Sequence, residues 1–425
     1  MRVETRTVAS LCGVELCALA SLLVPLFVGL AIRVPDVTDV TREVALSAVV
    51  VPGAIAAMVM NPVFGWLSDR SANRTRWIVG GALGGFVAAI GVAAAPTLPL
   101  LIISWCAMQG AYNATFAALY GSLSDRVHEA DRARVSGWFA ASATGALVLG
   151  MGAVVALPRS TFVLIMLIPL LTVPVAIAAA RHLNSLELTT ANTSRTDAER
   201  RMALWSALGG ASAGYWWVWL QRLVTQGAYS VVGLYGIYYL QRRVGLSESS
   251  AATWIASSTM VAGVLSMVAA IAVGRIVSRF IGYRTLLMVS LTVLGCALGI
   301  KAVGTVPEMY VVAALVAGVG IGAYSALDLS LALRAVEGSN AGTLLGFFNV
   351  ARTLPQSLVP LAAPALLAVG SGDPLGLRSS QNYLALNLGG VALTIVAIAL
   401  VVPVGASLLR GEGREPVPTP AVELS

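Results

Sequence analysis

The sequence predicts an all-α membrane protein in which twelve transmembrane helices form two pseudo-symmetric six-helix bundles. Its composition is the first reason: 57% of the 425 residues are hydrophobic and only 11% are charged, whereas soluble domains carry about a quarter of charged residues. Apolar runs longer than 18 residues also recur along the chain, as expected for helices that cross a bilayer. Finally, the two parts of the chain align with each other, which indicates an internal repeat.

Each predicted span is a window of mostly apolar residues long enough to cross the hydrocarbon core. In the first part of the chain we place spans at 8–32, 44–66, 77–95, 98–120, 135–157 and 161–180. In the second part we place them at 209–240, 251–273, 284–302, 308–333, 343–369 and 382–409.

The only long hydrophilic stretch divides the chain into two bundles. We therefore expect an N-terminal bundle at 1–180, a cytoplasmic linker at 181–208, a C-terminal bundle at 209–410 and a cytoplasmic tail at 411–425. Most of the arginines fall in loops on the side of the termini and the linker, and positive loops stay in the cytoplasm. We expect a multi-pass protein of the inner, cytoplasmic membrane with both termini inside.

The repeat has an offset of about 209 residues. The matching pairs are Gly65 with Gly274, Arg70 with Arg279, Gly137 with Gly346 and, with a further shift of about three residues, Gly110-Ala111-Tyr112 with Gly322-Ala323-Tyr324. Six-span repeats of this kind are related by an axis along the membrane normal and enclose a site near the midplane. The repeat thus predicts alternating access to a central cavity.

A loop motif carries a resemblance to a known family. The run NPVFGWLSDR from Asn61 to Arg70, followed by Arg74 and Arg76, resembles the signature loop between spans 2 and 3 of the major facilitator superfamily. Within it, Gly65, Ser68, Asp69, Arg70 and Trp77 are similar to the loop of the glycoside-pentoside-hexuronide cation symporters and their sucrose-transporter relatives. The resemblance continues in residues 125–137 and 344–360 and implies the major facilitator fold and uptake of a sugar-like solute.

One difference from that group concerns the coupling ion. Its sodium-using members carry an aspartate directly before the proline of span 2, where this chain has Asn61 before Pro62. A hard cation needs several oxygen ligands, and one neutral amide does not supply them. Sodium coupling is therefore disfavoured, which favours coupling to protons or no ion coupling.

The expected gating residues lie in this motif, at its repeat equivalent after span 8 and in span 11. These are Gly65, Asp69, Arg70, Arg74, Arg76, Arg279 and Arg352. Charged residues in short loops can form ion pairs and helix-end contacts when the cytoplasmic side is shut. The alternative for the arginines is a role as topology anchors only.

Four charged residues lie within predicted spans away from their ends: Glu15, Arg222, Asp328 and Arg352. Intramembrane charges are costly and therefore point to function. We assign proton coupling to Glu15, because burial of a carboxylic acid favours its protonated form. The alternative is an ion pair of Glu15 with Arg222, its near-equivalent in the repeat. For Asp328 and Arg352, on consecutive antiparallel spans, a structural salt bridge is favoured over a transport role.

Polar and aromatic residues follow one helical face in three spans. The expected substrate cavity contains Gln109, Tyr112, Asn113, Tyr215, Arg222, Gln226, Tyr324 and Asp328. Amides beside aromatic rings suit a polar, ring-bearing solute. Phe116, Trp219 and Tyr229 continue the faces, and Asn349, Arg352 and Gln356 form the third stripe. Ordinary helix packing or an interfacial aromatic belt are the alternatives.

Other function classes are excluded or remote. Lys301 is the only lysine, so there is no nucleotide-binding loop with its required lysine, and primary ATP-driven transport within this chain is excluded. With two histidines and no motif of a hydrolase or metalloprotease, we expect no enzyme activity, cofactor or metal site. The four cysteines read as packing residues. The expected partners are the lipid bilayer, a small-molecule substrate and protons, without nucleic acid, and we expect a monomer.

Together these features predict a secondary active transporter that moves a small organic solute across the cytoplasmic membrane by alternating access with protons. Proton-driven efflux of drugs or metabolites is the alternative, although the span 5 proline typical of such exporters is missing beside Gly145, Gly150 and Gly152. A receptor-like chain without transport is the remote third possibility.

Overall fold

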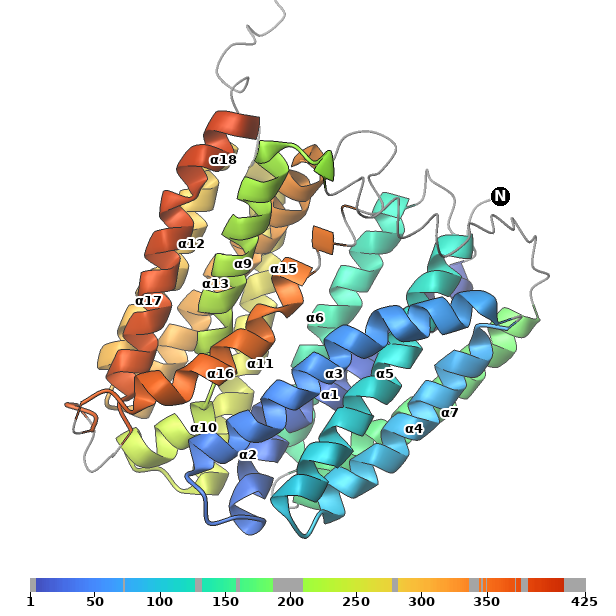
Figure 1. Ribbon diagram of the computed structural model, residues 1–425, viewed down its shortest axis with the longest axis horizontal. Helices are drawn as coiled ribbons and strands as arrows, with labels where there is room; N and C mark the ends of the chain where they lie inside the picture. Colours follow the sequence, from blue (N-terminus) through green and yellow to red (C-terminus); the bar gives the residue numbers. More distant parts are fainter. Residues whose placement is uncertain are drawn as a thin grey trace, which may run out of the picture.

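A computed structural model describes residues 5–71, 73–126, 132–157, 161–185, 209–276, 282–335, 344, 347–348, 350–370, 372–375 and 381–408 (Figure 1). Within these residues every regular element is a helix and there is no strand. The predicted fold class is therefore confirmed. The greater part of the predicted linker and the C-terminal tail lie outside the described residues.

The first half of the chain, residues 5–185, forms long helices that run back and forth between two ends of the molecule. A continuous helical stretch comes first, made of α1 (Thr5–Val24), the π-helical turn η1 (Pro25–Gly29), α2 (Leu30–Arg33) and the short η2 (Val34–Asp36). The others are α3 (Arg42–Arg70), α4 (Thr75–Ala94), α5 (Leu98–Arg126), α6 (Arg132–Ala156) and α7 (Thr161–Asn184). Helix α7 thus continues four residues beyond the predicted span.

The second half, residues 209–408, follows the same course with more interruptions. It contains α9 (Ala213–Gly233), α10 (Gly236–Tyr239), η4 (Leu240–Val244), α11 (Glu248–Ile276), α12 (Tyr283–Val303) and α13 (Pro307–Ala335). It ends with α15 (Val350–Thr353), α16 (Pro355–Leu367), α17 (Tyr383–Ala399) and α18 (Val401–Leu408).

Two predicted spans are broken helices, for identifiable local reasons. Between α9 and α10 the backbone of Tyr235 has φ 54°, a left-handed conformation that a residue with a Cβ rarely adopts. This break separates the long α9 from the short α10. The second break, at Leu354, directly precedes Pro355, whose backbone nitrogen has no hydrogen to donate to a helical hydrogen bond.

The helices have the length and composition of membrane spans. Eight helices in the described part of the chain are long and apolar enough to cross a bilayer. Prolines 52 and 62 lie inside α3, which transmembrane helices tolerate. The protein is therefore a multi-pass membrane protein, while the count of twelve crossings stays a prediction.

We name the two ends of the molecule by what lies there. The tail end is where α1 begins and α18 ends, and the distal end is where η2, α4, α10 and α12 end (Figure 1). Near the distal end, buried side chains of both halves form one hydrophobic cluster, which joins Val34 and Val49 to Ile237 and Tyr239.

Towards the tail end the core divides. One cluster belongs to the first half and includes Leu11, Ile78 and Leu119, and another belongs to the second half and includes Leu287 and Val404. Within the described residues the two halves thus share a core at the distal end and have separate cores at the tail end.

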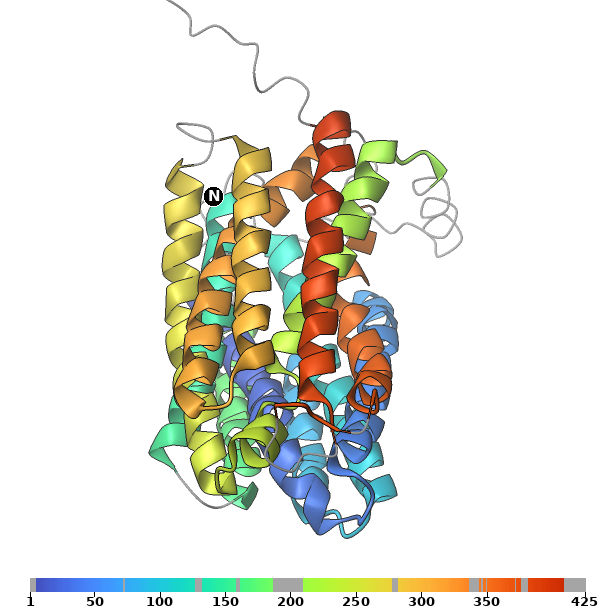
Figure 2. The same ribbon diagram turned by 90° about the vertical axis from the view of Figure 1, so that its left-hand side faces the viewer.

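Helix packing follows the same division. In the first half α5 packs on α3 and α4, and α1 packs on α6 and α7. In the second half α13 packs on α11 and α12, as Figure 2 shows from its outer side, and α17 packs on α9 and α12. The halves meet through α6 with α11 and through α3 with α16.

Candidate functional site

The four predicted intramembrane charges lie at a similar depth. Glu15, Arg222 and Asp328 lie seven to ten residues from the tail ends of α1, α9 and α13, which is about 10 to 15 Å along each helix. Arg352 belongs to α15, which contacts α9 and α3. The charges therefore gather where the two cores separate.

Arg222 and Asp328 form an ion pair. Arg222 Nη1 lies 3.1 Å from Asp328 Oδ2, and both side chains are only 11% exposed. The pair joins α9 to α13 within the second half. The expected Asp328–Arg352 salt bridge and the alternative Glu15–Arg222 pair are therefore both wrong, because Arg222 and Asp328 satisfy each other.

Aromatic and amide groups of the second half surround this ion pair. The guanidinium of Arg222 lies 4.4 Å from the centre of the Phe348 ring, a cation–π contact. The hydroxyl of Tyr324 lies 3.0 Å from Gln221 Oε1 and 3.3 Å from Asp328 Oδ1. The pair is thus fixed in place from several sides and unsuited to large movement within this half.

Glu15 has a different environment. It is 3% exposed, and its two carboxylate oxygens accept hydrogen bonds from hydroxyls of two other helices. The donors are Tyr120 of α5, at 2.9 Å, and Ser142 of α6. Among the described residues no basic side chain forms an ion pair with Glu15. A buried carboxyl held by hydroxyls can exchange a proton without losing a charge partner.

Arg352 is the exposed member of the four. It has no hydrogen-bond or ion-pair partner among the described residues, but its guanidinium attracts the carboxylates of Glu15 and Asp328 electrostatically. It also acts on the hydroxyls of Tyr120 and Tyr229. Tyr120 and Tyr229 are 45% and 37% exposed. We call the region between the halves in which these groups come within electrostatic reach of Arg352 the central space.

The predicted stripe on α5 is divided between core and interface. Tyr112 is fully buried, and its ring fills the space above Gly85 of α4, so its assignment to the substrate cavity is wrong. Asn113 accepts a hydrogen bond from Asn61 Nδ2 at 3.0 Å and donates to the carbonyl of Gln109. It joins α3 to α5, and Gln109 is half-buried beside it.

The predicted stripe on α9 is divided in the same way. Tyr215 is fully buried and donates to the carbonyl of Leu344. Trp219 stacks on Phe347 with ring centres 5.7 Å apart and donates to its carbonyl. The packing alternative therefore applies to this part of the stripe. Gln226 is half-buried.

The span 10 residues of the predicted cavity are also internal. Tyr324 is 3% and Asp328 is 8% exposed. They stabilise the Arg222 pair rather than line a free surface.

The gating residues can be placed in part. Gly65 lies in α3 with open space where a Cβ would be. Arg74 donates to Ser68 Oγ at 3.3 Å and lies against Gly121 of α5. Arg76 is exposed. The side chains of Asp69 and Arg70, together with Arg279 and Asn349, lie outside the described residues, so their gating or stripe roles stay predictions.

Polar contacts between the halves gather at the distal end. Glu43 of α3 is fully buried and accepts from Tyr383 of α17 at 2.6 Å, while Arg242 Nε lies 3.1 Å from the same oxygen. Ser47 bonds to the hydroxyl of Tyr235 and donates to the carbonyl of Pro360 at 2.9 Å. The broken segment after α9 is thus held against the first half.

Two further contacts complete this distal contact group. Tyr238 donates to the carbonyl of Ala31 at 2.9 Å, and Arg42 donates to Gln241 at 3.1 Å. Nothing in the sequence patterns singled out these residues, although Glu43 and the Arg242–Arg243 pair are charges at the edges of apolar windows. Their position at the ends of predicted spans is the feature of the sequence from which they could have been identified.

A buried basic group lies beside the distal contact group. Lys301 is 3% exposed, and its ammonium donates to the carbonyl of Val232 at 2.6 Å, at the end of α9. The rings of Tyr239 and Tyr310 lie 5.5 and 5.4 Å from the ammonium. The positive charge therefore caps the carbonyl end of the broken helix.

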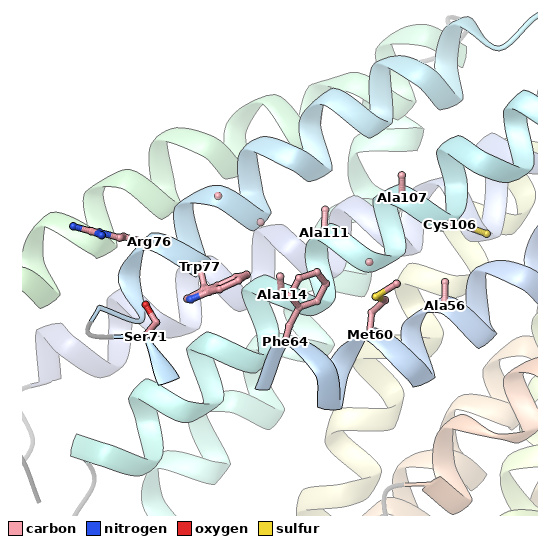
Figure 3. Close-up of a pocket in the computed structure, with 13 residues that line it drawn as sticks. Ala56, Met60, Phe64, Ser71, Arg76, Trp77, Cys106, Ala107, Ala111 and Ala114 are labelled. Carbon is pink, nitrogen blue, oxygen red and sulfur yellow. The ribbon is translucent and has the colours of Figure 1, made fainter. Parts of the chain in front are cut away.

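A lateral groove of about 780 Å³ lies apart from the central space (Figure 3). It is formed by α3, α4 and α5, with Met60, Phe64 and Trp77 among its lining residues and Ser71 and Arg76 at one end. Its lining is otherwise apolar and it belongs to the first half alone. It therefore does not join the charges described above.

Two functional candidates on the central space were missed from the sequence. Tyr120 lies four residues after Phe116, so it continues the helical face of the α5 stripe, and extending that stripe by one turn finds it. Ser142 carried no signal, because a single serine in an apolar helix is common.

Comparison with known proteins places the chain in a family. It matches the Major Facilitator Superfamily over residues 17–360. No curated protein matches its sequence.

Solved structures are similar in fold. A bacterial homologue of the human lysosomal transporter Spinster, in an inward-facing and unoccupied conformation, has a TM-score of 0.72 at 13% identity, covering 97% of this chain and 99% of that one. The peptide transporter POT in complex with sulfate has a TM-score of 0.70 at 13% identity, covering 95% and 96%. The nucleoside transporter NupG has 0.69 at 11%, covering 94% and 98%.

These likenesses concern the fold, and they give no support to a glycoside or sucrose subgroup. The family match extends from the first helix to α16. The chain belongs to the major facilitator superfamily.

Proposed function

We propose that this protein is a secondary active transporter that moves a small organic solute across the cytoplasmic membrane by alternating access, with Glu15 as its proton site. The observation that carries the proposal is the division of the core. The halves share one hydrophobic cluster at the distal end and have separate clusters at the tail end. Such a molecule is closed on one side, and rocking of the halves exchanges the sides.

The proposed orientation gives the two sides their meaning. With both termini cytoplasmic, the distal contact group closes the outer side and the central space belongs to the inner side. The similar Spinster homologue was solved in an inward-facing conformation, which supports this reading of the fold. Opening to the outside requires the Glu43 and Ser47 contacts to break.

Proton coupling follows from the surroundings of Glu15. Its hydroxyl partners come from α5 and α6 of its own half, while the positive charge of Arg352 acts on it from the other half. Rocking of the halves changes the distance to Arg352 but leaves the hydroxyls in place. The affinity of Glu15 for a proton therefore differs between the two states, which is the requirement for coupling.

Sodium is disfavoured as the coupling ion. The amide nitrogen of Asn61, at the position where the sodium-using symporters carry an aspartate, donates to Asn113. This contact supports a structural role in joining α3 to α5. No carboxylate takes its place among the described residues of that part of α3.

The test uses purified protein. A thermal-unfolding screen identifies a solute that binds, because ligands of the folded state raise the melting temperature. One panel of compounds contains sugars and glycosides, and the second contains amphipathic cations and antibiotics. That solute is then measured in proteoliposomes with an imposed pH gradient. Glu15→Gln should abolish accumulation driven by the gradient and leave solute exchange intact.

Glu15→Asp is the matched control, because it keeps a titratable carboxyl. Equal gradient-driven accumulation in the parent and Glu15→Gln would refute the proton role. Stabilisation by the amphipathic panel alone, with outward movement, would replace uptake by efflux.

A further inference from the structure

The described charges of the central space balance only while Glu15 is ionised. Arg222 and Asp328 cancel each other in a direct ion pair. The charges that remain among the described residues are the carboxyl of Glu15 and the guanidinium of Arg352, which interact electrostatically from opposite halves without a hydrogen bond between them. The net charge of the site is therefore zero when Glu15 is ionised and +1 when it is protonated.

Arg352 is the group that is free to bind a ligand. It is exposed, unlike the buried Arg222, and it donates no hydrogen bond within the described residues. A guanidinium at membrane depth is costly unless water or an anion solvates it. Its planar set of donors matches a carboxylate with two parallel hydrogen bonds.

Aromatic side chains flank this guanidinium. Tyr229 of α9 and Tyr120 of α5 are both partly exposed and within its electrostatic reach. Their hydroxyls and rings offer contacts to the uncharged part of a small organic molecule. These side chains thus suit a solute with an anionic head and a polar or ring-bearing body.

We propose that Arg352 binds the carboxylate of the transported solute, so that the substrate class is small organic carboxylates and each binds together with a proton on Glu15. This inference rests on the transport function proposed above. When Glu15 is ionised, its carboxylate competes with the ligand for the field of Arg352. When Glu15 is protonated, the competition ends and the positive charge of Arg352 is left for the ligand.

Among the described residues, few titratable or charged groups lie around Glu15. Tyr120 of α5 and Ser142 of α6 donate to it, Cys12 lies one turn away on its own helix, and Arg352 acts from α15. Of these groups only Glu15 is a carboxylic acid, so we expect it to be the one that gains and loses the proton.

Helix α7 also packs on α1. Its titratable group, His182, contacts Thr7 at 3.2 Å, about 12 Å along α1 from Glu15. Removing the Glu15 carboxyl therefore separates the effect of Glu15 from that of His182.

The experiment compares matched pairs of probes by thermal unfolding of the full chain in detergent. Each pair contains a carboxylate and a neutral analogue: glucuronate with glucose, and benzoate with benzamide. We expect the carboxylates to raise the melting temperature. The neutral analogues should bind with an apparent affinity at least tenfold lower. Equal stabilisation within every pair would overturn the proposal.

Substitutions of Arg352 test whether its guanidinium binds the carboxylate. Arg352→Gln should weaken carboxylate binding at least tenfold, whereas Arg352→Lys, which keeps the charge without the fork, should retain part of it. Arg284→Gln, an exposed arginine of α12, is the control and should bind as the parent does. Unchanged carboxylate preference in Arg352→Gln would refute the role of Arg352.

The pH dependence tests the link to the proton. Between pH 8 and pH 6 carboxylate binding to the parent should tighten, and Glu15→Gln should bind tightly and equally at both values. A parent that shows no pH dependence contradicts the competition. If glucose or an amphipathic cation moves with protons while carboxylates neither bind nor move, the transport function stands and the carboxylate assignment fails.

Discussion

Arg222 and Asp328 lie 3.1 Å apart on α9 and α13 and neutralise each other inside the second half. The carboxyl of Glu15, at a similar depth in the first half, has hydroxyl partners instead. The burial of these two acids is therefore compensated in different ways. Asp328 stays charged in an ion pair, whereas the hydrogen bonds of Glu15 allow its charge to change. This difference separates a structural acid from a titrating one.

Asp328→Asn is expected to destabilise the protein strongly. It leaves the buried guanidinium of Arg222 without its anion, and breaking one partner of a buried pair costs about 3 to 5 kcal/mol. The measurement is thermal unfolding in detergent, followed through intrinsic tryptophan fluorescence.

The double variant Arg222→Gln with Asp328→Asn is the control, because it removes both charges. It should be more stable than Asp328→Asn alone. A double variant that unfolds at or below the temperature of the single one would show that the pair is not the source of the loss.

Glu43→Gln is expected to loosen the distal end. The variant weakens the contacts with Arg242 and Tyr383, and a loss of about 1 kcal/mol shifts a conformational equilibrium roughly fivefold. The reporter is a cysteine at Ala45, which is fully buried in the shared core, in a background without the four native cysteines. Its labelling by a membrane-impermeant maleimide should be about five times faster.

Asp36→Asn provides the comparison, since its partner Arg33 lies in an ion pair within one half and Asp36 is 57% exposed. Labelling in this variant should match the parent. Identical rates for all three proteins would mean that the Glu43 contacts do not hold the distal end closed.

Two glycines of α4 should respond in opposite ways to alanine. A Cβ at Gly85 would lie 2.6 Å from the ring of Tyr112, which is fully buried and has no room to move. Gly85→Ala should therefore lose about 1 to 3 kcal/mol by overpacking.

At Gly80 nothing lies within 4 Å of the added atom. Gly80→Ala should leave stability unchanged or raise it by up to about 1 kcal/mol, because alanine is the better helix former. The melting temperatures of both variants in detergent decide the matter, and equal losses would contradict the tight packing at Gly85.

The sequence predicted what depends on position along the chain and missed what depends on the rotation of each helix about its own axis. Apolar windows gave the helices and the depths of Glu15 and Asp328, because hydrophobicity along the chain reports burial in the bilayer. The partner of Asp328 depends on which way each helix is turned. Two arginines at suitable depth, Arg222 and Arg352, were available, and nothing in the spacing distinguishes them.

The same limit explains the stripe on α5. Its residues do share one region of the helix surface, yet Tyr112 faces α4 while Tyr120 reaches the central space. A face a turn or two long can belong to a core at one point and to a cavity at the next, because neighbouring helices diverge. The broken helix at Tyr235 was equally out of reach, since a left-handed tyrosine has no sequence signature.

The position of Lys301 has a practical consequence for following the transport cycle. It is the only lysine of the chain, and with the distal end closed its amine is covered by carbonyls and tyrosine rings. An amine-reactive reagent therefore finds no side-chain target on the folded protein in this state. Acylation of Lys301 would report any step of the cycle that opens the contacts among α9, α10, α12 and α13, and mass spectrometry would detect it at a single residue.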